Sequence, residues 1–346
     1  MRKIRIFWPS WNPKGIIRGN NSISTRRSIL GWAFEFVLYI REGNKTVNIV
    51  KELTAHALYI RFELGLESLM DETYRREGLH RANLICRSIF DPEDHVVFLH
   101  HTSFSRNDKR VSTVRLKRFF KTRLKQISSS ILPYAFDESD TDLYTFERKA
   151  QIKAKEIRIP YVLECIGNID FRRKPEAGGQ IYLYNKTKGI LFHMYDDRGC
   201  DVYSSGRDVL LPLYHKHRNW ILDYNRYTID NFFGEGLAGI IETEEEQKAR
   251  REFNSKKITH SGINLRRTNT CKIIHHFEIP SVNAATFAKE LAFTTFEIRL
   301  ISKTDRTVTF TAVKTEALAQ IDYQSHLMSM YGKKYGGYIG WSYEKV

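Results

Sequence analysis

The stretch HHFEIPSVNAATFAKELAFTTFEIRLI, residues 275–301, decides the fold of the C-terminal segment. Residues 275–279 are short and apolar enough for a strand, and residues 282–292 place their apolar side chains at helical spacing. Residues 293–301 then alternate between apolar and polar side chains, as a half-buried strand does. The segment is therefore predicted to begin with a strand, a helix and a second strand.

The remaining residues of this segment repeat the pattern. Residues 307–313 alternate as a strand, 317–332 have helical spacing, and 337–343 form a closing strand that contains GYIGW. This order is the split βαβ arrangement. We therefore predict an α+β protein whose residues 271–346 form a ferredoxin-like βαββαβ domain.

The preceding two-thirds predict a mixed α+β domain over residues 27–235. Strands are expected at 57–64 and 95–101, on either side of a helix over 67–90 that ends at Asp91-Pro92. Later in the chain, residues 180–203 contain three short apolar stretches separated by polar turns. These stretches predict an antiparallel meander.

Two further helices are predicted around this domain boundary. One begins at Ser204 or Ser205 and continues to about Asp223. The other covers residues 242–254 and places acids before bases, which suits a helix dipole. We interpret it as a solvated helix within a linker over residues 236–270.

The net charge of +15 favours contact with polyanions, nucleic acids above all. Residues 1–26 form a basic N-terminal arm, and residues 106–125 hold nine basic side chains against Asp108. Part of this run falls in a predicted amphipathic helix over 114–127. The candidate nucleic-acid contacts on that helix are Arg115, Lys117, Arg118, Lys121 and Lys125.

Several classes of protein are disfavoured. No apolar stretch has the length of a membrane span, so we expect a cytoplasmic protein without membrane contact. The four cysteines are far apart and form no CxxC pair, so reduced thiols are expected rather than a zinc site or disulfides. No catalytic motif is recognisable, and we expect no cofactor and no metal.

Three carboxylates lie close together in the sequence, at Asp196, Asp197 and Asp201, with Arg198 between them. Such a group could bind magnesium or serve in acid–base catalysis. Asp side chains also accept hydrogen bonds from their own turn, and this second interpretation is the better supported. A metal-dependent enzyme remains an alternative.

Two blocks of the N-terminal two-thirds resemble a bacterial domain of unknown function, the 3885 family. They are IRFELG at 60–65, with Arg61 and Glu63, and YDDRGCDV at 195–202, followed by WILDY at 220–224. The activity of that family is not established, so the resemblance implies a related domain without implying a function.

The C-terminal segment resembles the ribonuclease E inhibitor B family. The resemblance rests on the strand that begins with a histidine pair and on the closing GGYIGW, where Ile339 stands at a position that is commonly acidic in the family. The family's namesake binds a ribonuclease and lowers its activity by protein contact. Its known members are acidic, whereas this segment is basic. Interaction candidates are His275, His276, Tyr335, Tyr338 and Trp341.

These observations lead to one leading hypothesis and two alternatives. The leading hypothesis is a non-enzymatic cytoplasmic regulator that binds a protein, with a nuclease as one possible target and an immunity protein against a toxin as a variant. The first alternative is a basic nucleic-acid-binding protein. The second is the metal-dependent enzyme that uses Asp196, Asp197 and Asp201.

Overall fold

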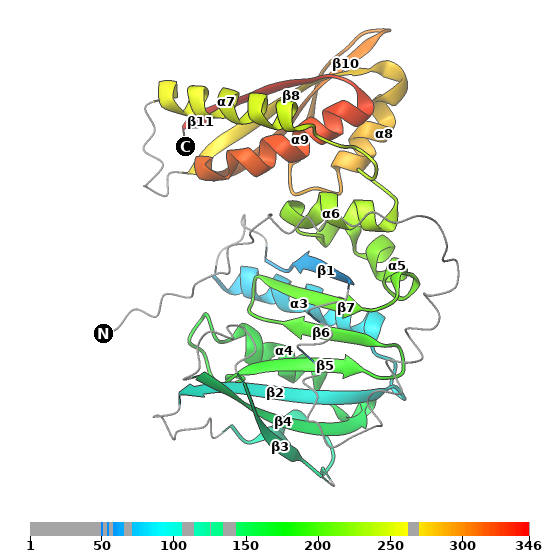
Figure 1. The fold of residues 1–346 in the computed structure, drawn as a ribbon, viewed down its shortest axis with the longest axis vertical. Helices are drawn as coiled ribbons and strands as arrows, with labels where there is room; N and C mark the ends of the chain where they lie inside the picture. The colour runs from blue at the N-terminus through cyan, green and yellow to red at the C-terminus, as the bar shows by residue number, and fades with distance from the viewer. Residues whose placement is uncertain are drawn as a thin grey trace, which may run out of the picture. The chain divides into compact units, whose positions relative to one another are not determined.

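The computed structural model describes most of the chain. The basic arm predicted over 1–26 and the candidate Lys125 lie outside the described part, which forms two antiparallel sheets with helices (Figure 1). The described residues are 50, 54, 58–65, 71–105, 114–124, 126–133, 143–261 and 270–345.

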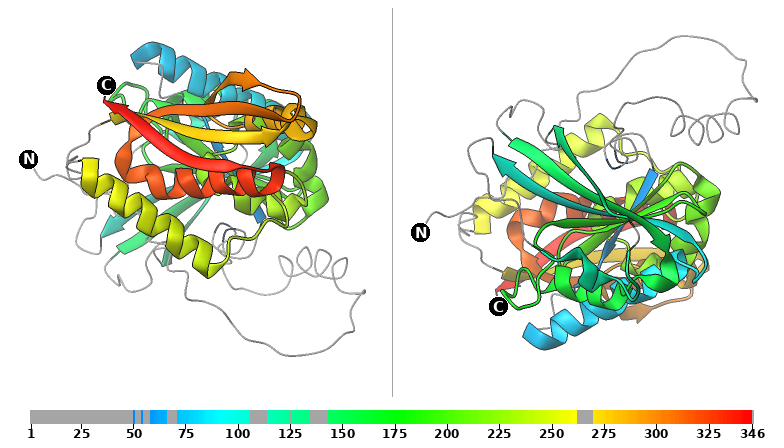
Figure 2. Two further views of the ribbon diagram at one scale, coloured as in Figure 1. Left: turned by 90° about the horizontal axis from the view of Figure 1, so that it is seen from above. Right: turned by 90° about the horizontal axis from the view of Figure 1, so that it is seen from below.

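The first sheet has seven strands in the order β1-β7-β6-β5-β2-β4-β3, and all neighbours are antiparallel. The meander predicted over residues 180–203 is confirmed as β5, β6 and β7, and the sheet has a strong twist (Figure 2). The strands are β1 (Leu58–Glu63), β2 (His95–Ser105), β3 (Ser128–Pro133), β4 (Leu143–Lys153), β5 (Gln180–Asn185), β6 (Ile190–Met194) and β7 (Gly199–Ser204).

Helices α3 (Asp71–Ile89) and α4 (Ile159–Gly167) form the main hydrophobic core together with the first sheet. Helix α3 is the one predicted over 67–90, and it ends just before Asp91-Pro92. Phe62, Phe98 and Phe192 are fully or almost fully buried in this core. The apolar periodicity therefore predicted this helix, and Asp91-Pro92 predicted its end.

The helix predicted over 114–127 is wrong. Among the described residues of that range, only a 3-10 turn, η1 (Leu116–Phe119), forms, and Phe120 is already extended and bridges to Ile157. A 3-10 turn has three residues per turn, so it brings Leu116 and Phe119 to one side. Phe120 reaches the same core through extended backbone, with its ring 5.0 Å from that of Phe98. The apolar side chains here are thus spaced three and four residues apart, as in an α-helix, although the backbone is a 3-10 turn followed by an extended residue.

The single helix predicted from Ser204 or Ser205 to Asp223 is also wrong. The chain forms α5 (Arg207–Lys216), the 3-10 turn η3 (Arg218–Trp220) and α6 (Asp223–Phe233). The interruption occurs where Ile221 bridges to Phe62 and the Leu222 amide donates to the Arg61 carbonyl at 3.0 Å. Pairing with β1 requires extended backbone, which ends the helix.

The second sheet has the order β11-β8-β10-β9 and is also antiparallel. The predicted succession of strand, helix, two strands, helix and strand is observed, and α8 and α9 contact the sheet (Figure 2). These elements are β8 (Thr270–Pro280), α8 (Ser281–Leu291), β9 (Glu297–Lys303), β10 (Thr307–Ala317), α9 (Ile321–Tyr335) and β11 (Tyr338–Lys345).

Helix α7 (Glu244–Ser261) is longer than the helix predicted over 242–254, and it is more than a solvated linker. Most of its side chains are exposed, but Asn254 is buried and donates to Asp322 Oδ1 at 2.7 Å and to Ser325 Oγ at 2.8 Å. These contacts attach α7 to α9. None of the described helices combines the length and the apolar character needed to cross a bilayer.

A buried arginine connects α6 to the segment between α8 and β9. The Arg226 side chain is fully buried and donates to Asp223 Oδ1 at 3.1 Å, and to the carbonyls of Ile221 and Phe293. Asp223 Oδ2 in turn accepts from the Thr295 amide at 3.0 Å. Phe293 and Thr295 lie between α8 and β9, so the network joins α6 to this connecting segment.

Replacing Arg226 with alanine is expected to lower the free energy of unfolding by about 3–5 kcal/mol, because Asp223 would stay buried without its cationic partner. Urea denaturation followed by circular dichroism measures the change. Arg299→Ala is the matched control, since Arg299 pairs with Glu297 on the exposed strand β9 and its loss should leave the midpoint unchanged. Equal effects of the two substitutions would refute the role of Arg226.

Candidate interaction sites

The sequence blocks 60–65 and 195–202, which resemble the 3885 family, meet on one face of the first sheet. Arg61 of β1 lies opposite Asp201 of β7, and its Nε and Nη2 donate to Asp201 Oδ1 and Oδ2, each at 2.7 Å. The Tyr203 hydroxyl donates to Asp201 Oδ2 at 2.9 Å. Asp201 is buried, whereas the Arg61 side chain remains 30% exposed. The pair therefore presents a fixed guanidinium at the edge of a buried polar face.

Aromatic rings continue this polar face across the sheet. The Arg61 guanidinium lies 5.5 Å from the ring centroid of Tyr59 and 5.7 Å from that of Tyr195. His193 stacks on Tyr182 at 4.1 Å, and burial lowers the pKa of His193 to about 3. The imidazole is therefore neutral at physiological pH.

The same face holds a buried histidine–carboxylate pair. His101 Nε2 lies 2.9 Å from Glu147 Oε2, on the adjacent strands β2 and β4. Sequence analysis singled out neither Glu147 nor His193. The alternation of polar side chains along β4 and β6 was the available signal, but it does not show which strands are neighbours.

The aspartates of the 196–201 block have separate roles. Asp196 caps its own turn: its Oδ1 accepts from the amides of Arg198 at 2.9 Å and Gly199 at 3.2 Å. Its Oδ2 accepts from Arg198 Nε at 2.8 Å. The turn role predicted for this block is confirmed for Asp196.

Asp197 points elsewhere. It is buried, and within the described part of the chain its Oδ1 has no hydrogen-bond partner. Burial raises the pKa of Asp197 to about 6, and Asp170 contributes in the same direction. In the described ranges, no three His, Cys, Asp or Glu side chains are grouped so that they could hold a metal ion. Glu63, at the end of β1, accepts from Arg81 Nη1 through its carbonyl at 3.2 Å.

Comparison with known proteins identifies the domain that carries these residues. Residues 53–225 match the family model of a domain of unknown function, DUF3885, and this range is half of the chain. The chain belongs to the DUF3885 family. The match contains Arg61, Glu63 and the whole 196–201 block, so the predicted resemblance is confirmed for the N-terminal part.

One relative of the DUF3885 domain comes from a bacterium, which supports the expected bacterial origin. It is the uncharacterized protein YnaE of Bacillus subtilis strain 168, which is 27% identical over 157 residues. The aligned region covers 42% of this chain and 73% of YnaE. No solved structure matches the chain.

Beyond the DUF3885 match, α7, α9 and β11 surround a pocket of about 440 Å³. Its apolar lining includes Phe253 of α7, Met330 of α9, and Tyr338, Ile339 and Trp341 of β11. We call it the α7–α9 pocket. All five residues of the GYIGW sequence, 337–341, line this pocket.

The charged groups of the α7–α9 pocket are paired with one another. Glu242 accepts from Arg250 at 2.6 and 3.0 Å and contacts His326 Nδ1 at 2.8 Å. Burial alone would raise the pKa of Glu242, but the hydrogen bonds and charge of Arg250 and His326 outweigh it and lower the pKa. Glu246 pairs with Lys333 at 2.8 Å, which lowers its pKa as well.

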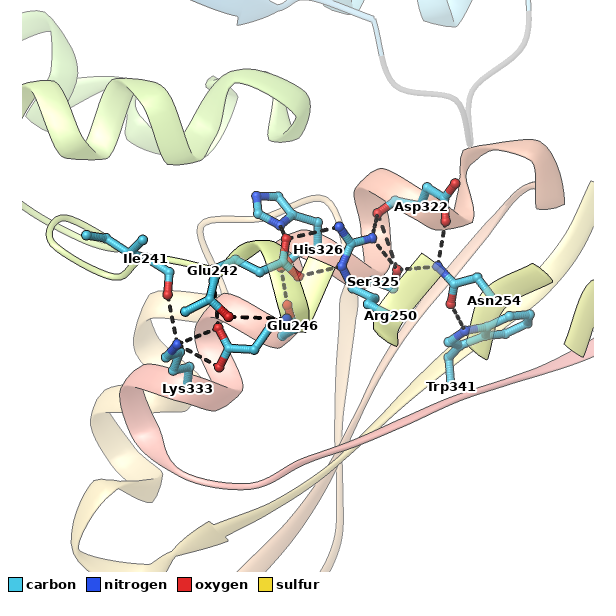
Figure 3. A network of polar contacts seen from close by, with 12 residues as sticks. Ile241, Glu242, Glu246, Arg250, Asn254, Asp322, Ser325, His326, Lys333 and Trp341 are labelled. Carbon is cyan, nitrogen blue, oxygen red and sulfur yellow. Dashed lines mark hydrogen bonds and ion pairs between the residues drawn. The ribbon is translucent and has the colours of Figure 1, made fainter. Parts of the chain in front are cut away.

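A hydrogen-bond chain fixes the aromatic wall of the pocket. Trp341 Nε1 donates to Asn254 Oδ1 at 2.8 Å, and the Asn254 amide group is held by Asp322 and Ser325 (Figure 3). The Trp341 side chain is thereby oriented by α7 and α9 together.

The five interaction candidates of the C-terminal segment do not form one surface. Tyr338 and Trp341 line the α7–α9 pocket. His275 is buried behind Tyr338, with its Nδ1 2.9 Å from the hydroxyl, and burial lowers its pKa to about 3. His276 lies on the other side of β8 and contacts Ser342 Oγ at 2.7 Å. Tyr335 packs in the core.

The described nucleic-acid candidates do not share a helical face either. Arg115, Lys117 and Lys121 are exposed around the 3-10 turn. Arg118 is tied to the Glu176 carbonyl and lies 4.9 Å from the ring centroid of Phe119. A continuous basic stripe would need the α-helix that is absent here.

The raised pKa of Asp197 predicts a pH-dependent stability. The folded protein binds the proton more tightly than the unfolded chain, so its stability should fall as pH rises from about 4 to about 6. Asp197→Asn should remove this loss, and the variant should gain relative to the wild type over the same range. Urea denaturation between pH 4.5 and 8 measures the difference, and a difference that does not change with pH would contradict it.

Proposed function

We propose that this protein is a non-catalytic regulator that acts by binding another protein through the α7–α9 pocket. The observation that carries the proposal is an apolar rim over an interior whose charges are already paired. Phe253 is 48% exposed and Ile339 is 63% exposed, on α7 and β11 respectively. Exposed large apolar side chains beside a pocket are typical of interaction sites.

The paired interior makes insertion of a partner's side chain favourable. Glu242, Arg250 and His326 satisfy one another, and Glu246 is satisfied by Lys333. An apolar side chain that enters the pocket therefore leaves no charge without its partner, which is the main cost in such interfaces. A volume of about 440 Å³ is sufficient for anchoring side chains.

The protonation of the pocket supports binding rather than catalysis. An acid–base catalyst works best when its pKa lies near the working pH. The pKa values of Glu242 and Glu246 are both lowered by their cationic partners. These two carboxylates are thus suited to holding structure at neutral pH rather than to exchanging protons.

The chemistry of the rim suggests the kind of partner. The Lys257 ammonium lies 5.2 Å from the ring centroid of Phe253 and 4.9 Å from that of Trp341, and it donates to the Trp341 carbonyl. We propose a partner segment that inserts an apolar side chain and carries an acidic residue next to it. That acidic residue would meet Lys257.

The class of partner rests on the C-terminal fold. The strand order β11-β8-β10-β9 supports a ferredoxin-like domain over 271–346, and such a fold is consistent with the resemblance to the ribonuclease E inhibitor B family. A ribonuclease or a toxin in the cytoplasm is therefore the partner we propose. The basic character of the segment favours an acidic surface on that partner.

Site-specific photo-cross-linking tests the proposed surface. A benzophenone amino acid at position 253 should capture one protein in host cells, whereas the same group at Val282, which is 87% exposed on α8, should not. The captured protein is then purified and titrated calorimetrically. Phe253→Asp with Ile339→Asp should weaken its binding at least about tenfold, because two rim contacts are lost.

The matched control is Val282→Asp with Leu300→Asp, which also places two charges on exposed apolar positions of the C-terminal unit. It should bind the partner as the wild type does. Equal cross-linking at 253 and 282, or equal binding by both double variants, would disprove the surface.

A further inference from the structure

A second hollow lies in the DUF3885 domain, where β3 separates from β4. The pairing of these strands ends at Ser128 and Lys149, and β4 continues to Lys153 without β3 beside it. The hollow has a volume of about 1240 Å³. Its walls are β4 with the turn after it, the start of β2, residues 122–124, 126 and 128, and the turn between β5 and β6. We call it the β4 hollow.

Cationic side chains from three of these walls line the β4 hollow. They are Arg123, Lys149, Lys153, Lys155 and Lys186. Lys153 and Lys155 share Glu93, at 2.7 and 2.5 Å, and these hydrogen bonds lower the pKa of Glu93 to about 2. Among the described residues, Arg123, Lys149 and Lys186 make no ion pair.

Glu156 is the one carboxylate among the described lining residues, and it is already engaged. Glu156 Oε1 accepts from the Thr122 hydroxyl at 3.1 Å, and its Oε2 accepts from the Lys153 amide at 3.2 Å. Counting the described side chains alone, five cations against Glu93 and Glu156 leave three positive charges around the hollow. Unpaired cations that surround a concave surface raise the local concentration of polyanions.

We propose that the β4 hollow binds the sugar–phosphate backbone of a single-stranded nucleic acid. A positively charged groove that follows the backbone is the common feature of such sites. The described lining contains no Phe, Tyr or Trp on which bases could stack, so binding is expected to be independent of sequence.

The hollow differs from the site that the basic run first suggested. Arg123 belongs to that run. Lys149 comes from strand β4, and Lys186 comes from a turn about 60 residues after Arg123 in the chain. The hollow is also separate from the α7–α9 pocket, which lies outside the DUF3885 match. Either site can therefore fail in experiment without the other.

Fluorescence anisotropy of the full chain with labelled 20-nucleotide DNA and RNA of several sequences tests the proposal. The triple variant Arg123→Gln, Lys149→Gln, Lys186→Gln should bind at least about tenfold more weakly at 0.1 M salt. Its plot of log affinity against log salt should be shallower by about 2, since each phosphate contact contributes about 0.7 for single strands. Thermal melting verifies that the variant is folded.

The matched control removes three exposed cations from residues 270–345, which contain the second sheet. Its substitutions are Lys289→Gln, Lys303→Gln and Arg306→Gln. It should bind within about threefold of the wild type and keep its salt slope. No binding by the wild type at 50 mM salt would overturn the proposal. An equal loss in both triple variants would also overturn it, because the effect would then reflect net charge rather than the hollow.

Discussion

The buried guanidinium of Arg226 is the interaction on which the described structure most depends. It donates to the carbonyl of Ile221, just before α6, and to that of Phe293, between α8 and β9. Asp223 accepts a hydrogen bond from Thr295 of the same segment. Burying a charge is costly unless every donor finds an acceptor. The network therefore holds the start of α6 against the segment between α8 and β9.

The sequence predicted those elements whose periodicity is long and regular. Helix α3, the meander β5–β7 and the order of elements over 270–345 all have such patterns. The errors at 114–127 and at 204–223 share one physical cause, which is tertiary contact. Phe120 packs into the core from extended backbone, and Ile221 pairs with β1. Local apolar spacing therefore did not determine the backbone conformation at either place.

The candidate sites were predictable only in part, for a similar reason. Arg61 and Asp201 are 140 residues apart, and their pairing follows from strand order rather than from spacing. The GYIGW sequence drew attention to Tyr338 and Trp341, but Phe253 and Arg250 belong to a helix that looked like a solvated linker. The β4 hollow likewise depends on where β3 leaves its neighbour, which no local pattern reveals.

Ile221 and Leu222 also affect self-association, because they lie along an edge strand of the first sheet. A strand at the border of a sheet offers free amide and carbonyl groups, and these invite a strand from another molecule and lead to aggregation. Ile221 and Leu222 occupy the outer side of β1 at Phe62 and Arg61. An intruding strand would have to displace the start of α6 and, with it, the buried arginine network. Displacing that network would leave a buried charge unpaired, so this border of the sheet is protected against the addition of a foreign strand.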